Sequence, residues 1–313
     1  MAGIIAAGVL LPLVYLLIRA FGASPEMLNN VVFRMRNLRL LGNTLLLTFG
    51  VLILDALIAL PLAYLSVRVK VKARRFITLL GVLPLAIPGY VMAYALLGMG
   101  GYNGTFQAWF GLNMPRISGF TGSLIVLSIA LSLISYLKSC GPPCWGLDQS
   151  IEEVSRSLGY DAQSTFLKVI LPQLRPAFLA GSLLISLHVI GDFGTVSLMR
   201  FETFSYALYL QYIAAYDRIY AAWLALMLLA LTTGALVLEY KLLKKAIFHR
   251  LGRGVSKAKT YLDLGPWAIP AYTFVAVLTL VALVLPVSSI VFWVNQTAFA
   301  SVAGDLSRHS STR

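Results

Sequence analysis

The sequence predicts an all-α membrane protein with about seven transmembrane helices. Hydrophobic residues make up 59% of the 313 residues and charged residues only 12%. A soluble globular domain has about 45–50% apolar and about 25% charged residues. The apolar residues form long segments, too uniform for barrel strands. Because backbone in lipid must satisfy its own hydrogen bonds, these segments are expected to be helices.

Seven apolar segments approach or exceed the length of about 20 residues that crosses a hydrocarbon core. They are residues 2–20, 39–67, 76–99, 120–140, 177–199, 219–240 and 266–294. No basic region precedes residues 2–18 and no clear cleavage site follows them. The first segment is therefore interpreted as a spanning helix and not as a signal peptide.

Basic residues predict the orientation. Loop 68–75 carries five Lys and Arg residues, and 241–259 carries seven. Both lie on the same side as loop 146–176, so the positive-inside rule places all three, and the N-terminus, in the cytoplasm. Three arginines on the opposite side reduce the difference in basic residues between the two sides of the membrane: Arg34, Arg36 and Arg39. The bases do not form one patch interleaved with aromatics, so nucleic acid is not an expected partner.

A polar segment, Glu152–Pro172, interrupts the apolar chain. Apolar residues recur within it at helical spacing, which predicts two short amphipathic helices. Gly159 lies between them, where a turn favours a residue without a Cβ. Pro172 is expected to end the second helix and Pro176 to begin the next element. So many polar groups are costly in lipid, so the segment is predicted to present a docking surface in water.

This segment resembles the EAA loop of ABC-importer permeases. Glu153-Val-Ser is followed six positions after the glutamate by Gly159, and the nine-residue spacer leads to Val169-Ile-Leu-Pro172. Val154 and Ser155 replace the two alanines of the family pattern. The resemblance implies a type I (MetI-like) helical bundle whose loop contacts a cytoplasmic ABC ATPase dimer. The implied docking residues are Glu152, Glu153, Arg156, Gly159, Leu171 and Pro172.

Two further segments resemble the ferric-iron subgroup of these permeases. The first is Pro84-Leu-Ala-Ile-Pro88-Gly-Tyr90, whose prolines are expected to kink or unwind the third span. The second is Asp192-Phe-Gly-Thr-Val, which is followed by Thr203-Phe204 and by Asp217-Arg218. Broken helices in membranes line a cavity or pack against protein. For the two prolines, a kink that serves helix packing and makes no substrate contact is an equally good interpretation.

Polar residues within the spans suggest a translocation path. Asp55 lies in the second span, where an acid at the helix centre costs about 2.5–3.5 kcal/mol, so it should face a partner or water. His188 and Asp192 lie four residues apart on one helix face. A locally satisfied His–Asp pair is favoured over a proton or metal contact. The predicted path residues are Asp55, Pro84, Pro88, Tyr90, His188 and Asp192.

The composition predicts neither a metal site nor a cofactor on this chain. Only three histidines occur, and the pair Cys140 and Cys144 lacks the usual zinc spacing. No Gly-x-x-x-x-Gly-Lys-[Ser/Thr] motif occurs either. ATP and Mg are therefore expected on the partner ATPase, and the chain is expected to be a transport subunit and not an enzyme.

The expected organisation has three parts. Residues 1–240 form a first permease half with six spanning helices, 241–265 a basic cytoplasmic linker, and 266–313 the start of a truncated second half. Pro12 and Pro286 occupy matching places in similar apolar segments, which indicates a faint internal repeat. Permeases of the ferric-iron type are commonly two fused halves. The alternative is a genuine seven-span protein.

The segment Lys138–Trp145 contains a glycine and two prolines where the family continues a helix. If the gene uses suitable codons for this segment, the reading frame that starts one base earlier encodes a helical, permease-like sequence. A local reading-frame error is therefore one hypothesis for it, and resequencing tests it.

The resemblance as a whole implies the membrane subunit of an ABC importer for ferric iron in a bacterial inner membrane. A binding protein would deliver the substrate, and a second permease half or copy would complete the path. Permeases for thiamine, sulfate or polyamine are the alternatives within the class. Outside it, the alternatives are a proton-coupled secondary transporter and a non-functional fragment.

Overall fold

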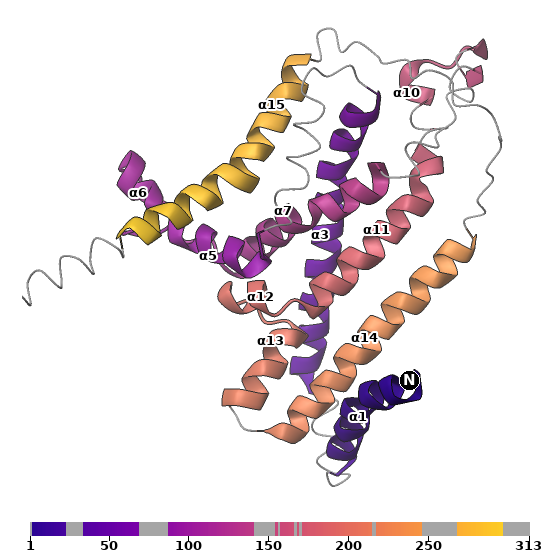
Figure 1. Ribbon diagram of the computed structural model, residues 1–313, viewed down its shortest axis with the longest axis vertical. Helices are drawn as coiled ribbons and strands as arrows, with labels where there is room; N and C mark the ends of the chain where they lie inside the picture. The colour runs from indigo at the N-terminus through magenta and orange to yellow at the C-terminus, as the bar shows by residue number, and fades with distance from the viewer. Residues whose placement is uncertain are drawn as a thin grey trace, which may run out of the picture.

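The computed structural model describes residues 2–22, 34–68, 87–140, 154–155, 157–165, 168, 171–214, 217–245 and 268–296. Over these ranges the chain forms helices and connecting loops, with no strand (Figure 1). The all-α prediction is therefore confirmed. Most of the predicted linker 241–265 lies outside the described residues, so the predicted division into two halves stays a prediction.

Within the described residues, six long helices form the bundle. They are α1 (Ala2–Phe21), α3 (Met35–Arg68), α7 (Gly119–Cys140), α11 (Leu171–Gly191), α14 (Arg218–Lys245) and the helix Ala268–Gln296, which comprises α15 (Ala268–Thr279), the π-helical turn η5 (Leu280–Val284) and a further helical stretch. The shorter elements are α5 (Gly89–Met99), α6 (Thr105–Phe110), α10 (Ala162–Thr165), α12 (Gly194–Leu198), α13 (Phe204–Tyr209) and η3 (Leu210–Ala214).

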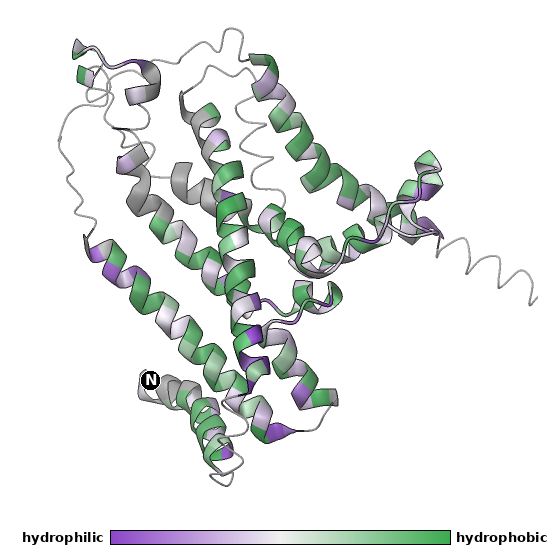
Figure 2. Ribbon diagram, turned by 180° about the vertical axis from the view of Figure 1, so that it is seen from behind, coloured by the Kyte–Doolittle hydropathy of each residue, from purple (hydrophilic) through white to green (hydrophobic). Residues whose placement is uncertain are grey.

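Three of these helices are long and apolar enough to cross a membrane by length and composition alone. They are Met35–Ala59, Arg218–Leu242 and Ala268–Gln296. Shorter apolar helices occur at Leu10–Phe21, Gly89–Met99, Gly119–Leu131 and Leu179–Gly191. Large apolar side chains point outward, as a lipid-facing surface requires: Leu11 is 69% exposed and Ile269 is 78% exposed. Figure 2 shows hydrophobic residues along the lengths of these helices.

Two predicted spans differ from the observed helices. The described part of the span 76–99 is helical only from Gly89, after Pro88. The span predicted at 177–199 instead begins at Leu171 and ends at Gly191. The expectation that Pro176 begins the next element is therefore wrong, because α11 already contains Pro176. That the preceding short helix ends at Pro172 stays a prediction, because most of residues 166–170 lie outside the described residues. Pro172 lies in the first turn of α11. The N–H groups of a first turn have no acceptor within the helix, so a proline there removes no helical hydrogen bond.

The core lies where α3 and α11 pack on α7. Its residues are Leu47, Val51, Leu127, Leu131, Ile185, Val189 and Val196, each at most 2% exposed. Gly50 permits the close approach of α3 to α7, because a Cβ there would lie 2.9 Å from Leu124 Cδ1. The helix 268–296 covers α5: Ala282 is buried with Met92 of α5, and Ser289 Oγ donates to the carbonyl of Ala95 at 3.2 Å.

Candidate functional site

The turn at Gly159 closes a helical segment in the way expected of a helix C-terminus. Leu158 N donates to Val154 O at 3.0 Å, and Tyr160 N donates to Ser155 O at 3.1 Å. The second bond spans six residues, as in the Schellman motif, which places Gly159 at the left-handed position. Its φ is +86°, and no heavy atom lies within 4 Å of a Cβ built there. The backbone thus requires glycine here through its conformation and not through lack of space.

The side chains around this turn are apolar and exposed. Val154 is 56% exposed, Leu158 71% and Tyr160 43%, and Lys168 Nζ lies 5.5 Å from the Tyr160 ring centre. Asp161 Oδ1 accepts a bond from Ser164 N at 3.3 Å and so caps α10. The turn therefore presents apolar side chains on a locally ordered backbone at one end of the bundle, near α10 in Figure 1.

Three of the six predicted docking residues can be placed. Gly159 lies in the turn, Leu171 is the first residue of α11, and Pro172 follows in its first turn. The other three, Glu152, Glu153 and Arg156, lie outside the described residues. From Leu171 the chain continues directly into α11, whose 21 residues are about 32 Å long at 1.5 Å per residue. A movement of its first turn would thus be carried to its far end.

At that far end, α11 gives way to α12 through Asp192. Asp192 Oδ1 accepts bonds from Thr195 N at 2.9 Å and Val196 N at 3.3 Å, and its Oδ2 accepts one from Thr195 Oγ1 at 3.3 Å. Its carbonyl accepts a 2.6 Å bond from Ser205 Oγ. The side chain thus caps α12 by satisfying backbone donors of its first turn. His188 is exposed one turn earlier and is not among these partners.

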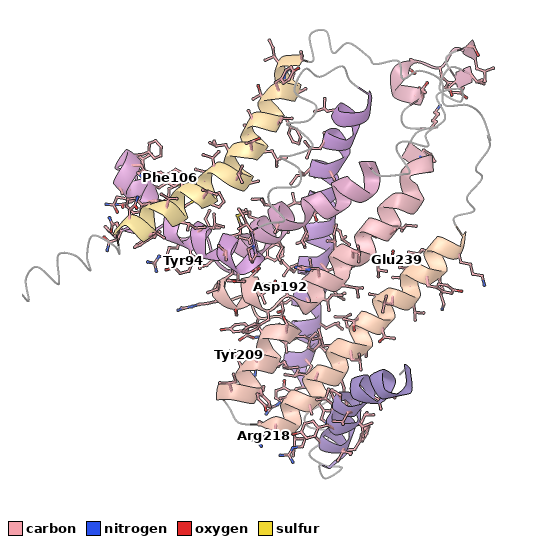
Figure 3. The ribbon with its side chains drawn as sticks, viewed as in Figure 1. Tyr94, Phe106, Asp192, Tyr209, Arg218 and Glu239 are labelled. Carbon is pink, nitrogen blue, oxygen red and sulfur yellow. The ribbon has the colours of Figure 1, made fainter. Side chains whose placement is uncertain are left out.

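Two interrupted helices meet at this point. A Cβ on Gly89 would lie 2.9 Å from Thr195 Oγ1, and one on Gly194 would lie 3.0 Å from Tyr90 Cβ. The start of α5, after Pro88, is therefore packed against the start of α12, after Asp192. Of the predicted path residues, the structure brings together Pro88, Tyr90 and Asp192 (Figure 3 labels Asp192). Pro84 lies outside the described residues.

Asp55 occupies a different environment. It is 0% exposed and lies on the face of α3 that also buries Val51 and Ala59. Neither carboxyl oxygen has a hydrogen-bond partner among the described residues, and the same holds for the buried Ser128 hydroxyl on α7. The expected contact of Asp55 with a polar partner is therefore not found in the described part of the chain.

A network at the distal end of the bundle, which we define as the end bearing the first turns of α3 and α14, was not anticipated from the sequence. Thr44 Oγ1 accepts a bond from Phe204 N at 3.2 Å, and Asn43 Nδ2 donates to Glu202 O at 2.9 Å. The Tyr220 hydroxyl, Oη, donates to Asn37 Oδ1 at 2.7 Å. The network joins α3 to Glu202, to the first residue of α13 and to α14. The sequence feature that could have indicated this network is the run of polar residues at the start of α3.

The described residues hold no group of three or more His, Cys, Asp or Glu side chains placed to bind a metal ion. The carboxyl oxygens of Asp192 accept hydrogen bonds from the first turn of α12. The carboxyl oxygens of Asp55 have no hydrogen-bond partner among the described residues.

The helical arrangement is similar to that of a solved ABC-transporter chain. In solved structures, a chain of the MetNI methionine ABC transporter in an inward-facing conformation matches with a TM-score of 0.56 at 14% identity, covering 72% of this chain and 100% of that one. Identity at that level shows the fold alone. The expected MetI-like bundle is therefore confirmed.

Sequence relatives confirm the resemblance to ABC permeases. The Fe(3+)-transport system permease protein FbpB 2 of Haemophilus influenzae is 29% identical over 96% of this chain and 57% of its own length. The sulfate transport system permease protein CysT of Escherichia coli is 29% identical over 49% of this chain and 55% of its own. The spermidine/putrescine permease PotB of Salmonella typhimurium is 27% identical over 44% and 50%. No family model matches the chain.

The chain spans about half the length of these curated relatives, 57%, 55% and 50% respectively. It is a multi-pass membrane protein of the ABC-permease fold.

Proposed function

We propose that this chain is a membrane subunit of an ABC importer that moves ferric iron across a bacterial inner membrane. One observation carries the proposal: similarity to the Fe(3+) permease extends over 96% of the chain, whereas similarity to the sulfate and polyamine permeases covers 49% and 44%. The alignment with the iron permease therefore includes both broken helices and the last helix. Sulfate, polyamine and thiamine remain alternative substrates for the same machinery.

The turn at Gly159 would be the contact with the ATPase. Its exposed apolar side chains, Val154 and Leu158, are of the kind that a protein interface buries. The ATPase dimer would bind ATP and Mg and hydrolyse the nucleotide, because the chain has no P-loop motif. In this proposal the turn, the N-terminus and the basic residues that follow α14 in the sequence face the cytoplasm. A binding protein would deliver substrate at the distal end, and a second permease half or copy would complete the path.

The coupling we propose runs along α11. Closure of the ATPase dimer moves the first turn of α11 at Leu171, and the helix carries that movement to Asp192. Because Asp192 caps α12 and α12 packs on the start of α5, the two broken helices shift against each other. The ATPase would change the populations of inward-open and outward-open states by binding one of them better.

The test combines capture of the ATPase subunit with uptake of radioactive ferric iron in reconstituted vesicles. Gly159→Val places a β-branched residue at a φ of +86°, and we expect loss of capture and of uptake. Gly111→Val is the matched control, because Gly111 also has a positive φ, +68°, and open space around a built Cβ, but caps the C-terminus of α6, away from the Gly159 turn. The Gly111→Val variant therefore has a similar backbone strain and leaves the turn at Gly159 unchanged.

Capture that survives Gly159→Val, or that is lost equally in Gly111→Val, would contradict the docking assignment. Uptake driven by a proton gradient without the ATPase would support a secondary transporter instead. Uptake of sulfate, thiamine or polyamine in place of iron would correct the substrate, and absence of any uptake would identify a non-functional fragment.

A further inference from the structure

An arginine occupies the left-handed position at the end of α12. Phe201 N donates to Val196 O at 2.9 Å, and Arg200 N donates to Ser197 O at 3.2 Å. These are the two bonds of a complete Schellman motif, and they place Arg200 where glycine is the usual residue. Its φ is 56°, the only positive φ of a non-glycine residue in the described ranges. Glycine would adopt this conformation without strain, so the backbone gives no reason for an arginine here.

No carboxylate among the described residues pairs with the guanidinium of Arg200. The residue is exposed, and no carboxylate of the described chain lies within 4.0 Å of it. Three described acids have other partners: Asp192 caps α12, Asp217 Oδ1 accepts a 3.0 Å bond from Tyr220 N, and Glu202 pairs with Arg36 at 4.0 Å. The positive charge is therefore available to a group outside the chain.

Other arginines at the distal end share this property. Within the described residues, no carboxylate lies within 4.0 Å of the exposed arginines Arg34, Arg39, Arg116, Arg200 and Arg218. They come from the start of α3, the loop before α7, the end of α12 and the start of α14, where Figure 3 labels Arg218. Charges distributed over four segments fit a broad acidic surface better than one small anion.

We propose that Arg200 binds a carboxylate on the surface of the protein that delivers substrate to the distal end. The inference rests on the proposed function, because that function makes the distal end the outer face. A guanidinium binds a carboxylate through two parallel hydrogen bonds, which fixes orientation as well as affinity. The remaining arginines steer the acidic surface toward the bundle. Because Arg200 ends α12, the contact acts directly on the helix that packs against α5.

The test uses the full chain with its ATPase in lipid nanodiscs, and the probe is the purified ferric-iron-binding protein of the same organism, loaded with iron. Arg200→Gly removes the charge and relieves the left-handed strain together, so we expect an unchanged or higher Tm and a Kd for the probe about tenfold weaker. Arg200→Lys keeps the charge but not the paired hydrogen bonds, and an intermediate Kd is expected. Lys244→Ala, at the opposite end of α14, is the control and should leave the Kd unchanged.

Each result bears on the inference. An Arg200→Gly variant that binds the probe as tightly as the wild type overturns it, and so does a weaker Kd accompanied by a marked fall in Tm, which would show a structural role. An unchanged Kd with loss of uptake of free ferric citrate would assign Arg200 to a small anion and also overturn it. The wild-type arm tests the proposed function separately: no binding of probe or ATPase refutes that function before any variant is compared.

Discussion

Removing the carboxylate of Asp192 should loosen the start of α12 and leave α11 intact. Asp192→Ala deletes one bond to Thr195 N at 2.9 Å, one to Val196 N at 3.3 Å and one to Thr195 Oγ1 at 3.3 Å. Loss of an N-terminal cap costs about 0.5–2 kcal/mol, typically about 1. We therefore expect a local loss of about 1–2 kcal/mol.

Hydrogen exchange measured by mass spectrometry gives the local readout. A loss of about 1–2 kcal/mol corresponds to an opening constant that is about 5–30 times larger. Exchange should accelerate by that factor in a peptide covering α12 and remain unchanged in a peptide covering the middle of α11. Asp192→Asn keeps one acceptor oxygen, so its exchange should lie between those of the wild type and the alanine variant.

Asp217→Ala is the matched control. Asp217 Oδ1 caps α14 through Tyr220 N at 3.0 Å, so its removal has a comparable cost at a different helix. Iron uptake should fall more in Asp192→Ala than in Asp217→Ala, since only Asp192 holds the helix that packs on α5. Unchanged exchange of α12 in Asp192→Ala would refute the capping role, and equal loss of uptake in both variants would refute the coupling through α12.

Three further substitutions, one of them a control, probe the buried face of α3. Gly50→Val would place a Cβ 2.9 Å from Leu124 Cδ1 and should lower the free energy of unfolding by about 1–3 kcal/mol, whereas Gly42→Val, with no heavy atom within 4 Å of a built Cβ, should have a smaller effect; thermal unfolding in detergent measures both. Asp55→Val should raise the Tm in the same assay, because it replaces a fully buried carboxyl that has no hydrogen-bond partner in the described chain with an apolar side chain of similar size. Equal effects of the two glycine substitutions, or a lower Tm for Asp55→Val, would contradict these expectations.

The helices themselves were largely predictable from the sequence. The predicted segments 2–20, 120–140 and 266–294 match helices that begin and end within a few residues of those limits. Hydropathy over about 20 residues suffices for this, because a helix in lipid satisfies its hydrogen bonds within its own segment. The turn at Gly159 was predictable for a related reason, since a left-handed position between two short helices favours glycine.

The end of α11 was not predictable in this way. An apolar run from 177 to 199 contains no residue that forbids a helix, and Asp192 looks from its spacing like a partner of His188. The chain instead leaves the helix at Gly191, because the Asp192 carboxylate accepts bonds from the backbone N–H groups of Thr195 and Val196. Which of two local hydrogen-bond arrangements forms depends on the surrounding packing, here on Ser205 and on Gly89 of α5.

The sequence by itself determined that this protein is a helical membrane protein with a polar turn-containing segment, because hydropathy and turn preference are properties of short stretches of chain. Only the tertiary structure showed that the start of α5 meets the start of α12, that Asp192 caps a helix and that Arg200 stands in a glycine position without an acidic partner in the described chain. These features join residues about 100 positions apart or depend on one backbone angle, and neither periodicity nor composition encodes such relations.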